Sequence, residues 1–384
     1  MTATATRTLP LALAADVALP LAIEDPRLDT PAVLVDLDVV EQNIARTAAY
    51  AARNGVAVRP HIKTHKSAAM ARRQLEAGAT GVCVATAGEA LVMAEAGIGD
   101  ITIAYPLVGR PKLDRVQRAL DSGATLTLTS DSEAVTEAYG DLASRWGRPV
   151  PVLVEVDTGM HRAGASPDLV VQQAARIATT PGLEFRGILT HAGHAHDVAG
   201  AAGIADVARQ EAVIMGDLRA DLEAAGLAPA VVSAGSTLTA PYLSARDGVT
   251  EVRPGTYVYN DLRTLACWSC TPDALAATVL TTVASVAGPR VTIDAGNKTL
   301  TSSQDASCGY GYPVGAPDVR FSRLSEEHGV LADPKGRLAA RVGDRLRILP
   351  VHVCVWMDLQ PEVYGVRGGQ VVERITVDAM RHSL

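Results

Sequence analysis

Between about residues 31 and 263, short apolar runs rich in β-branched residues alternate with longer, alanine-rich amphipathic segments. This alternation is typical of a β-α-β-α chain, in which helices cover an inner layer of parallel strands. The runs that we interpret as strands are 32–37, 56–63, 81–86, 101–106, 125–130, 150–157, 185–192 and 229–235. The clearest helical segments are 39–53, 67–77, 87–96 and 202–225. Eight strands with helices between them predict an α/β chain with a TIM (β/α)8 barrel.

The pattern changes after about residue 275. The chain there alternates apolar and polar residues, is rich in β-branched residues and has glycines at its turns, with almost no helical periodicity. We therefore predict an additional C-terminal all-β domain. The predicted bounds are 1–28 for an N-terminal arm, 29–265 for the barrel and 266–384 for the all-β domain.

The charge of the 384-residue chain favours a small-molecule partner. The formal net charge is -7, and lysine and arginine are nowhere dense enough to neutralise a row of phosphates. We therefore expect no nucleic-acid and no membrane partner. The chain also lacks an apolar run of about eighteen residues, so the sequence predicts no membrane-spanning helix.

The five cysteines predict a cytoplasmic protein. Their number is odd and they are scattered along the chain, which favours free thiols over disulfides. Cys267 and Cys270 form one CxxC pair with no second pair nearby, so we assign them no role. The apolar segment 9–23 is compatible with a signal peptide, but Asp16 and two prolines interrupt it, which favours an N-terminal arm.

A cluster of basic residues stands at the end of the predicted strand 56–63. Lys63 lies between His61 and His65, and Lys66 follows. Positive charge near a lysine favours its neutral amine, which is the form that attacks a carbonyl carbon. Since barrel active sites form at the carboxyl ends of strands, Lys63 is a candidate catalytic residue, and a solvated basic loop is the alternative.

Glycine-rich and polar turns follow other predicted strands. Arg162 stands just beyond the strand 150–157, in the segment VDTGMHRAG. Two later turns follow the last strands, where TIM barrels commonly bind phosphate through backbone amides and hydroxyls. The candidate phosphate-binding residues in these turns are Gly235, Ser236, Thr237, Gly255, Thr256 and Tyr257.

Eight sequence blocks occur in the order in which one known family carries them. They are TPAVLVDLDVVEQNI, RPHIKTHKS, VDTGMHRAG, SAGSTLTA, EVRPGTYVYND, IDAGNKTL, SEEHG and PVHVC. From about Asp29 to Glu373 the chain thus resembles the D-threonine aldolase and D-serine dehydratase family, relatives of alanine racemase. The resemblance implies an alanine-racemase-like barrel with an added β-domain, an active site between them, and a homodimer with a shared active site.

The same resemblance implies pyridoxal 5'-phosphate (PLP) as cofactor and assigns residues to it. Lys63 matches the Schiff-base lysine, and Arg162 matches the arginine that faces the pyridine nitrogen. A guanidinium can only donate hydrogen bonds, so the ring nitrogen stays unprotonated and the ring is a weaker electron sink. His194 is a further candidate, either stacking on the cofactor or hydrogen bonding near it; a loop histidine without a role is the alternative.

The block PVHVC is predicted to bind a metal. On a strand, His352 and Cys354 would point to the same face, and the resemblance assigns a divalent metal to this pair. A thiolate beside an imidazole favours zinc, with manganese or magnesium as alternatives; a buried cysteine beside a satisfied histidine is the other interpretation. Trp356 and Asp358 depart from the family pattern, so we expect either an altered substrate pocket or ordinary packing at Trp356.

The resemblance implies a lyase that acts on β-hydroxy D-amino acids, which are small-molecule substrates. A metal beside PLP can activate the β-hydroxyl as a leaving group, giving a 2-oxo acid and ammonia, or promote its deprotonation, giving glycine and an aldehyde. The sequence leaves these two outcomes open. The alternatives from other classes are a non-catalytic PLP carrier and an amino-acid racemase.

Overall fold

The computed structural model describes residues 12–383 of the chain, which form two compact units. We call them the strand-rich unit and the barrel unit. The strand-rich unit comprises the residues up to Val40, Tyr259–Arg263 and Leu275–Met380. The barrel unit comprises Glu41–Val258, Thr264–Ala274 and the residues from Arg381 on.

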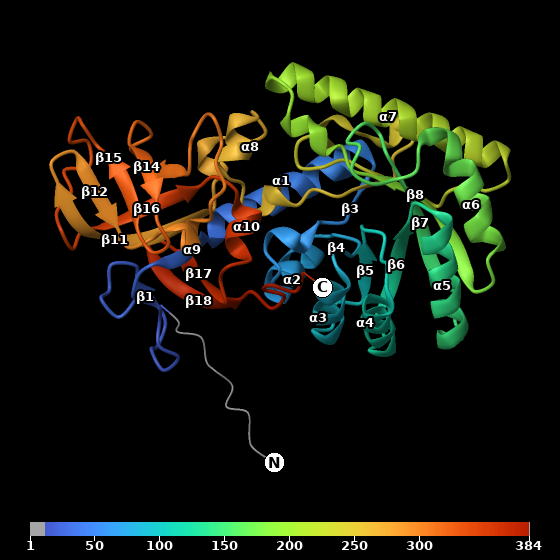
Figure 1. The fold of residues 1–384 in the computed structure, drawn as a ribbon, viewed down its shortest axis with the longest axis horizontal. Helices are drawn as coiled ribbons and strands as arrows, with labels where there is room; N and C mark the ends of the chain where they lie inside the picture. Colours follow the sequence, from blue (N-terminus) through green and yellow to red (C-terminus); the bar gives the residue numbers. More distant parts are fainter. Residues whose placement is uncertain (1–11, 384) are drawn as a thin grey trace, which may run out of the picture. The chain divides into compact units, whose positions relative to one another are not determined.

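The barrel unit contains eight parallel strands (Figure 1). Their order in the sheet is β3 (Ala57–Val58), β10 (Glu251–Val252), β9 (Val231–Ala234), β8 (Leu183–Thr190), β7 (Val150–Val156), β6 (Thr125–Ser130), β5 (Asp100–Ile103) and β4 (Val82–Val84). A parallel bridge between His61 and Cys83 joins the segment after β3 to β4, so the first and last strands of this order also meet. The TIM barrel predicted from the sequence is confirmed.

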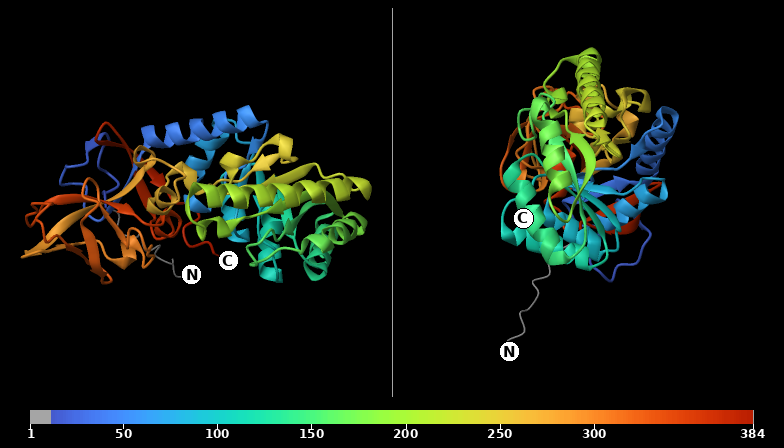
Figure 2. Two further views of the ribbon diagram at one scale, coloured as in Figure 1. Left: turned by 90° about the horizontal axis from the view of Figure 1, so that it is seen from above. Right: turned by 90° about the vertical axis from the view of Figure 1, so that its right-hand side faces the viewer.

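Helices cover the outer side of these strands (Figure 1; Figure 2). They are α1 (Leu37–Asn54), α2 (Ala68–Glu76), α3 (Ala87–Glu95), α4 (Arg110–Asp121), α5 (Glu133–Trp146), α6 (Val170–Thr179) and α7 (Gly200–Ala224). The short α8 (Leu262–Ala266) has residues in both units. Their amphipathic sequences explain the packing: in α4, for example, Leu113, Val116 and Leu120 are buried, three or four residues apart. The four helical segments predicted from the sequence are present.

The strand-rich unit contains a mixed sheet of mostly antiparallel strands. Its main order is β1 (Leu21–Ala22), β18 (Gln370–Thr376), β17 (Glu362–Arg367), β2 (Ala32–Asp36), β11 (Ala277–Ala287), β12 (Arg290–Ile293), β15 (Gly329–Ala332) and β14 (Arg320–Leu324). Beside β11 lies β16 (Arg345–Pro350), which also pairs with β13 (Gly311–Pro313). Two short helices, α9 (Asn297–Leu300) and α10 (Val353–Met357), complete the unit.

One predicted barrel strand was wrong. Residues 32–37 were predicted as the first strand of the barrel, but β2 pairs antiparallel with β11 and parallel with β17 in the strand-rich unit. The eighth barrel strand is β10, which directly precedes the turn that contains Gly255. The sequence before α1 has the local pattern of a β-α unit, and the pairing that decides its place involves residues more than 200 positions away.

The N-terminal residues that the structure describes are packed rather than free. Leu13, Leu21 and Leu28 are buried in one apolar cluster of the strand-rich unit, together with Leu34 and Tyr364. Residues 1–11 of the predicted arm lie outside the described part of the chain.

The described residues agree with two expectations from composition. Within residues 12–383, no helix combines the length and the apolar character needed to cross a membrane. All five cysteines are free thiols, as their number and spacing predicted.

Candidate active site

Lys63 lies on a tight turn just beyond the short strand β3. The turn is the 3-10 helix Ile62–Thr64, so the chain leaves strand conformation earlier than the predicted strand 56–63. His61 precedes this turn, and its Nδ1 accepts the Lys63 backbone N–H at 3.5 Å. The backbone N–H groups of His65 and Lys66 both donate to the Ile62 carbonyl oxygen, at 3.0 and 2.8 Å. These bonds fix the backbone on both sides of Lys63.

Lys66, the second lysine of the basic cluster after β3, has a structural partner. Its Nζ lies 3.3 Å from Glu89 Oε1, and both side chains are buried. Glu89 Oε2 accepts the backbone N–H of Ala85 at 2.7 Å, just before α3 begins. An ammonium group in a buried ion pair is held in place and charged, which supports Lys63 rather than Lys66 as the reactive lysine.

Two arginines near the strand ends differ in exposure. Arg162 is exposed, on a turn that Asp157 holds by accepting the backbone N–H groups of Gly159 and His161 at 2.9 and 3.0 Å. Arg253, at the end of β10, is buried and donates to Ser233 Oγ and to the Thr190 carbonyl oxygen. The sequence analysis missed Arg253, although its place one residue beyond a strand, just before the Gly255 turn, was a usable signal.

Two imidazoles share the electrostatic environment of these cations. Burial lowers the pKa of His61 and His191 well below the ordinary value, and the positive charges of Lys63 and Arg253 lower it further. Arg162 acts on both rings in the same direction. Both histidines are therefore neutral at pH 7, and the strand ends gather three cations and two neutral imidazoles. His191 was also missed, although it stands in the same segment as His194.

Glu155 is a buried acid near this cluster. Burial raises its pKa to about 7, while the charges of Arg162 and Arg253 partly oppose the rise. Its Oε2 is buried and has no hydrogen-bond partner within residues 12–383. A carboxyl group with such a pKa can exchange a proton near neutral pH.

His194 lies beside the turn that carries Arg162. It belongs to the 3-10 helix Gly193–His196, and its ring is 3.4 Å from the place where a side chain on Gly159 would begin. Its Nδ1 is buried without a hydrogen-bond partner in the described part of the chain. An unpartnered buried nitrogen is compatible with a ligand contact, so the predicted role of His194 stays a prediction.

The two predicted phosphate-binding turns lie side by side. The Gly255 N–H donates to Thr237 Oγ1 at 3.2 Å, and the Arg253 N–H donates to the Gly235 carbonyl oxygen at 3.2 Å. A side chain on Gly255 would lie 2.9 Å from the His61 carbonyl oxygen, so only glycine fits between this turn and the Lys63 turn.

Some amides of these turns already have partners inside the protein. The Gly235 N–H donates to Glu211 Oε1 at 2.9 Å, and the Ser236 N–H donates to Thr239 Oγ1 at 2.9 Å. Burial raises the pKa of Glu211, and the Gly235 N–H partly opposes that rise. Glu211 and Thr239 thus hold the first two amides of this turn within the protein.

Tyr257 is buried, and its hydroxyl has a partner within the protein. Gln74 Nε2 donates to the Tyr257 hydroxyl at 2.9 Å, and Gln74 Oε1 lies 3.1 Å from His65 Nε2. The tyrosine thereby connects the Gly255 turn to the residues after Lys63. Any contribution of Tyr257 to phosphate binding falls to its backbone rather than its hydroxyl.

The predicted metal-binding pair lies at the start of a helix instead of on a strand. The strand β16 ends at Pro350, His352 is the N-cap of α10, and Cys354 lies in the first turn of that helix. The prediction that both side chains alternate along a strand was therefore wrong. Within residues 12–383 the structure describes no group of three or more His, Cys, Asp or Glu side chains that could hold a metal.

Trp356, the residue that departs from the family pattern, is part of the core of the strand-rich unit. Its side chain is fully buried, and its Nε1 has no hydrogen-bond partner among the described residues. This burial favours the packing interpretation over a role in the substrate pocket.

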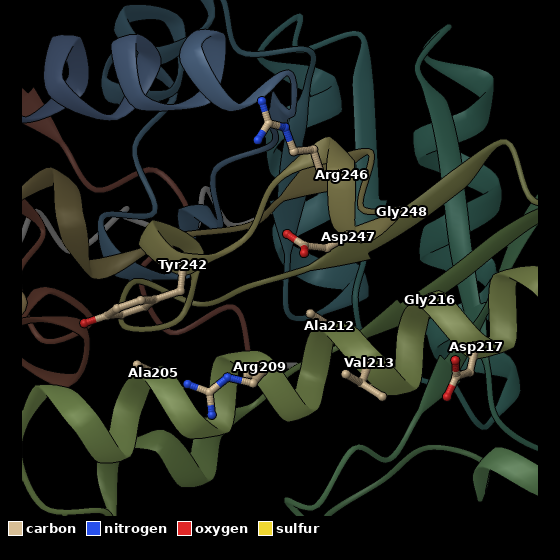
Figure 3. Close-up of a pocket in the computed structure, with 10 residues that line it drawn as sticks. All are labelled: Ala205, Arg209, Ala212, Val213, Gly216, Asp217, Tyr242, Arg246, Asp247 and Gly248. Carbon is tan, nitrogen blue, oxygen red and sulfur yellow. The ribbon is translucent and has the colours of Figure 1, made fainter.

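A hollow on the outer side of the barrel does not belong to this site (Figure 3). Arg209 and Val213 of α7 line one side of it, and Tyr242, Arg246 and Asp247 line the other. It shares no residue with the cluster around Lys63. The candidate site is therefore identified by its reactive side chains and not by this hollow.

Known proteins resemble this chain over most of its length. The model of the alanine racemase N-terminal domain matches residues 35–262, and the putative serine dehydratase domain matches residues 276–366. D-threo-3-hydroxyaspartate dehydratase of Delftia sp. (strain HT23) is 35% identical over 85% of this chain and 91% of its own. D-threonine aldolase of Arthrobacter sp is 35% identical over 91% of this chain and 92% of its own.

Solved structures give the same result. The crystal structure of D-threonine aldolase from Filomicrobium marinum has a TM-score of 0.88 at 30% identity, covering 96% of this chain and 100% of that chain. A mutant of D-threo-3-hydroxyaspartate dehydratase in the metal-free form has a TM-score of 0.83 at 32% identity, covering 91% and 97%. The chain therefore belongs to the D-threonine aldolase and D-serine dehydratase family of lyases, which has the alanine racemase fold.

Proposed function

We propose that this protein is a PLP- and metal-dependent lyase that acts on β-hydroxy D-amino acids. The observation that carries the proposal is the cluster at the strand ends: Lys63 on a fixed turn, with Arg162, Arg253 and two neutral histidines around it. The relatives support the substrate class, since they are named D-threo-3-hydroxyaspartate dehydratase and D-threonine aldolase.

The residues around Lys63 fit PLP. A phosphate and a substrate carboxylate are anions, and the side chains of Lys63, Arg162 and Arg253 all act on the same two histidines. Lys63 would hold the cofactor covalently and Arg162 would face its pyridine nitrogen. Gly235, Ser236, Thr237, Gly255, Thr256 and Tyr257 would line the phosphate site.

When bound, PLP supplies an electron sink for the bonds at the substrate Cα. The chain supplies the proton transfers around it. The amine of Lys63 can take a proton from an attached substrate. The neutral rings of His61 and His191 can accept or donate hydrogen bonds at their nitrogens, and Glu155 can exchange a proton near pH 7 because of its raised pKa.

His352 and Cys354 would bind a divalent metal. We favour zinc, because a thiolate and an imidazole together suit it, with manganese or magnesium as alternatives. With two protein ligands, positions stay open for substrate oxygens or water. A metal-free form of a mutant dehydratase in this family supports metal dependence in that relative.

Two reaction outcomes follow from one site. In dehydration the β-hydroxyl leaves as water, and the remaining enamine hydrolyses to a 2-oxo acid and ammonia. In retro-aldol cleavage the hydroxyl loses its proton and the Cα–Cβ bond breaks, giving glycine or a substituted glycine and an aldehyde. The strand-rich unit, with the pair His352 and Cys354, favours either reaction over a PLP carrier or a racemase, neither of which requires a metal.

We further propose a cytoplasmic homodimer with a shared active site. The free thiols favour a reducing compartment. The dimer rests on the family resemblance.

Product analysis tests the proposed function. The purified protein, loaded with PLP and zinc, is offered D-serine, D-threonine and 3-hydroxy-D-aspartate, and the Lys63→Ala variant serves as control. We expect either 2-oxo acid with ammonia or glycine with aldehyde from at least one substrate, and neither from the variant. L-isomers as the main product would establish a racemase, and no product from any substrate would favour the carrier.

A further inference from the structure

A chain of hydrogen bonds runs through the barrel interior and ends at Arg253. Arg59 donates from Nε to Glu251 Oε2 at 2.7 Å, and Ser233 Oγ donates to Glu251 Oε1 at 2.6 Å. Arg253 in turn donates to the Ser233 hydroxyl oxygen. Four residues from three neighbouring segments thus connect the amino-terminal end of the barrel with the candidate site.

The strand register explains this alignment. Glu251 and Arg253 are two residues apart on one segment, so their side chains point to the same side of β10. Glu251 is paired with Ser233 on β9 and with Ala57 on β3, which brings these segments level with one another. The same alternation on β3 places Arg59 beside Glu251. The chain of bonds therefore follows from the parallel register rather than from a loop.

We call this chain of hydrogen bonds from Arg59 through Glu251 and Ser233 to Arg253 the relay. Within it, buried side chains of opposite charge neutralise one another. Glu251 and Arg253 are buried, and Ser233 is fully buried. Burial alone would lower the pKa of Arg59, but the carboxylates of Glu251 and Asp100 raise it above its ordinary value. Buried charges are stable only with partners, so the relay fixes Arg253 as a cation at one position.

The Arg253 side chain makes one further hydrogen bond among the described residues of the barrel unit. Its second guanidinium nitrogen donates to the Thr190 carbonyl oxygen at the end of β8. Beyond that bond, the Ser233 hydroxyl is the group that connects its charge to a carboxylate. Loss of this one hydroxyl would release one arm of the guanidinium without touching Lys63 or the phosphate turns.

We propose that Ser233 and Glu251 are positioning residues, which hold the Arg253 guanidinium in place beside Lys63. The proposal rests on the proposed function, because the positioned cation faces the site in which PLP would bind. Neither residue touches the reacting atoms. They act through Arg253, and the effect of their loss should depend on Arg253 being present.

The first test is a titration of the apoprotein with PLP, in which the dissociation constant is measured by absorbance and fluorescence. We expect Ser233→Ala to weaken PLP binding by about tenfold, because the loss of a hydrogen bond to a charged group typically raises a dissociation constant by about that factor. Ser130→Ala is the matched control, since Ser130 is a buried serine on β6 whose hydroxyl bonds to Thr136 outside the relay. It should change binding by less than about twofold.

A double-mutant cycle separates positioning from a general structural effect. In an Arg253→Lys background the ammonium cannot span both partners, so Ser233→Ala should add less than about twofold. The same tenfold loss in both backgrounds would overturn the proposal.

A crystal structure of the Ser233→Ala apoprotein gives a readout without the cofactor. The Arg253 guanidinium should be displaced from its contacts, and an unmoved guanidinium would overturn the proposal. If the wild-type protein itself fails to bind PLP, the proposed function fails, while this structure still decides the role of Ser233.

Discussion

The barrel unit and the strand-rich unit differ in how their candidate functional residues are brought together. In the barrel unit, Lys63, Arg162 and Arg253 come from the ends of different strands and act on the same two histidines. In the strand-rich unit, His352 and Cys354 are neighbours on one short helix. Parallel strands share one carboxyl edge, so chain order alone predicts convergence there, whereas a mixed antiparallel sheet offers no such rule.

The two units also differ in what fills their interiors. The barrel carries a polar relay from Arg59 to Arg253, while the core of the strand-rich unit is apolar around residues such as Leu28 and Leu34. Substitutions that remove charge should therefore affect stability in the barrel, whereas changes at the metal pair should affect activity alone.

The largest effect is expected at the metal pair. His352→Ala or Cys354→Ala should lower the rate of product formation by about 100-fold or more, because the β-hydroxyl loses its metal. The thermal midpoint should stay nearly unchanged, because both side chains lie at a helix start and are only partly buried. Rates and bound metal, measured by elemental analysis, check this prediction.

The control is Val355→Ala, an exposed neighbour in the same helix. It should retain both metal and activity. Removal of the metal from the wild-type protein with a chelator should reproduce the loss, and added zinc should restore the rate. Full activity in the metal-depleted protein would show that the strand-rich unit serves another purpose.

The second effect contrasts the buried and the exposed arginine. Arg253→Ala removes the donor of two buried hydrogen bonds, to Ser233 Oγ and to the Thr190 carbonyl oxygen, while Glu251 keeps its ion pair with Arg59. The free energy of unfolding of the apoprotein should therefore fall by about 3 kcal/mol. Arg162→Ala, at an exposed turn, should change it by less than about 0.5 kcal/mol. Urea denaturation monitored by fluorescence measures both. Equal losses of unfolding free energy in the two variants would contradict the assignment of Arg253, and not Arg162, to the buried network.

The smallest effect concerns pH and Glu155. Its pKa is raised from 4.5 to about 7, so the folded protein binds this proton more tightly than the unfolded chain does. The contribution of Glu155 to stability is therefore fully present below about pH 4.5 and is lost as the pH rises to about 7. Across that window the loss is on the order of 2 kcal/mol.

Glu155→Gln should remove this pH dependence. Between pH 5 and pH 8 the wild-type apoprotein should lose unfolding free energy relative to the variant, as measured by urea denaturation. The charged groups that act on Glu155 are Arg162, Asp131, Arg253 and Asp157, and they stay in place in the variant. Parallel pH profiles for the two proteins would mean that Glu155 is ionised throughout.

Much of the barrel site could be predicted from the sequence, because its residues stand next to strand ends. The two phosphate turns were predicted from chain order, and the bond between Gly255 and Thr237 places them together. Arg253 and His191 were missed for a different reason. A single arginine or histidine carries no periodic signal, and its burial depends on neighbouring strands that only the fold supplies.

The errors in the other unit have a common cause. Residues 32–37 look like a barrel strand because a helix follows them, yet their pairing with β11 and β17 is set by distant segments. The valine-rich sequence after Pro350 predicts a strand, but the chain forms the short helix α10 instead. Local β-propensity decides neither which sheet a strand joins nor whether a short valine-rich segment stays extended.

Identification of the lysine that binds PLP tests the assignment of Lys63 directly. The PLP-loaded protein is reduced with borohydride and digested, and the modified peptide is sequenced by mass spectrometry. We expect a pyridoxyl group on Lys63 alone, since Lys66 is held in its ion pair with Glu89. Modification of Lys66, or of no lysine at all, would contradict it.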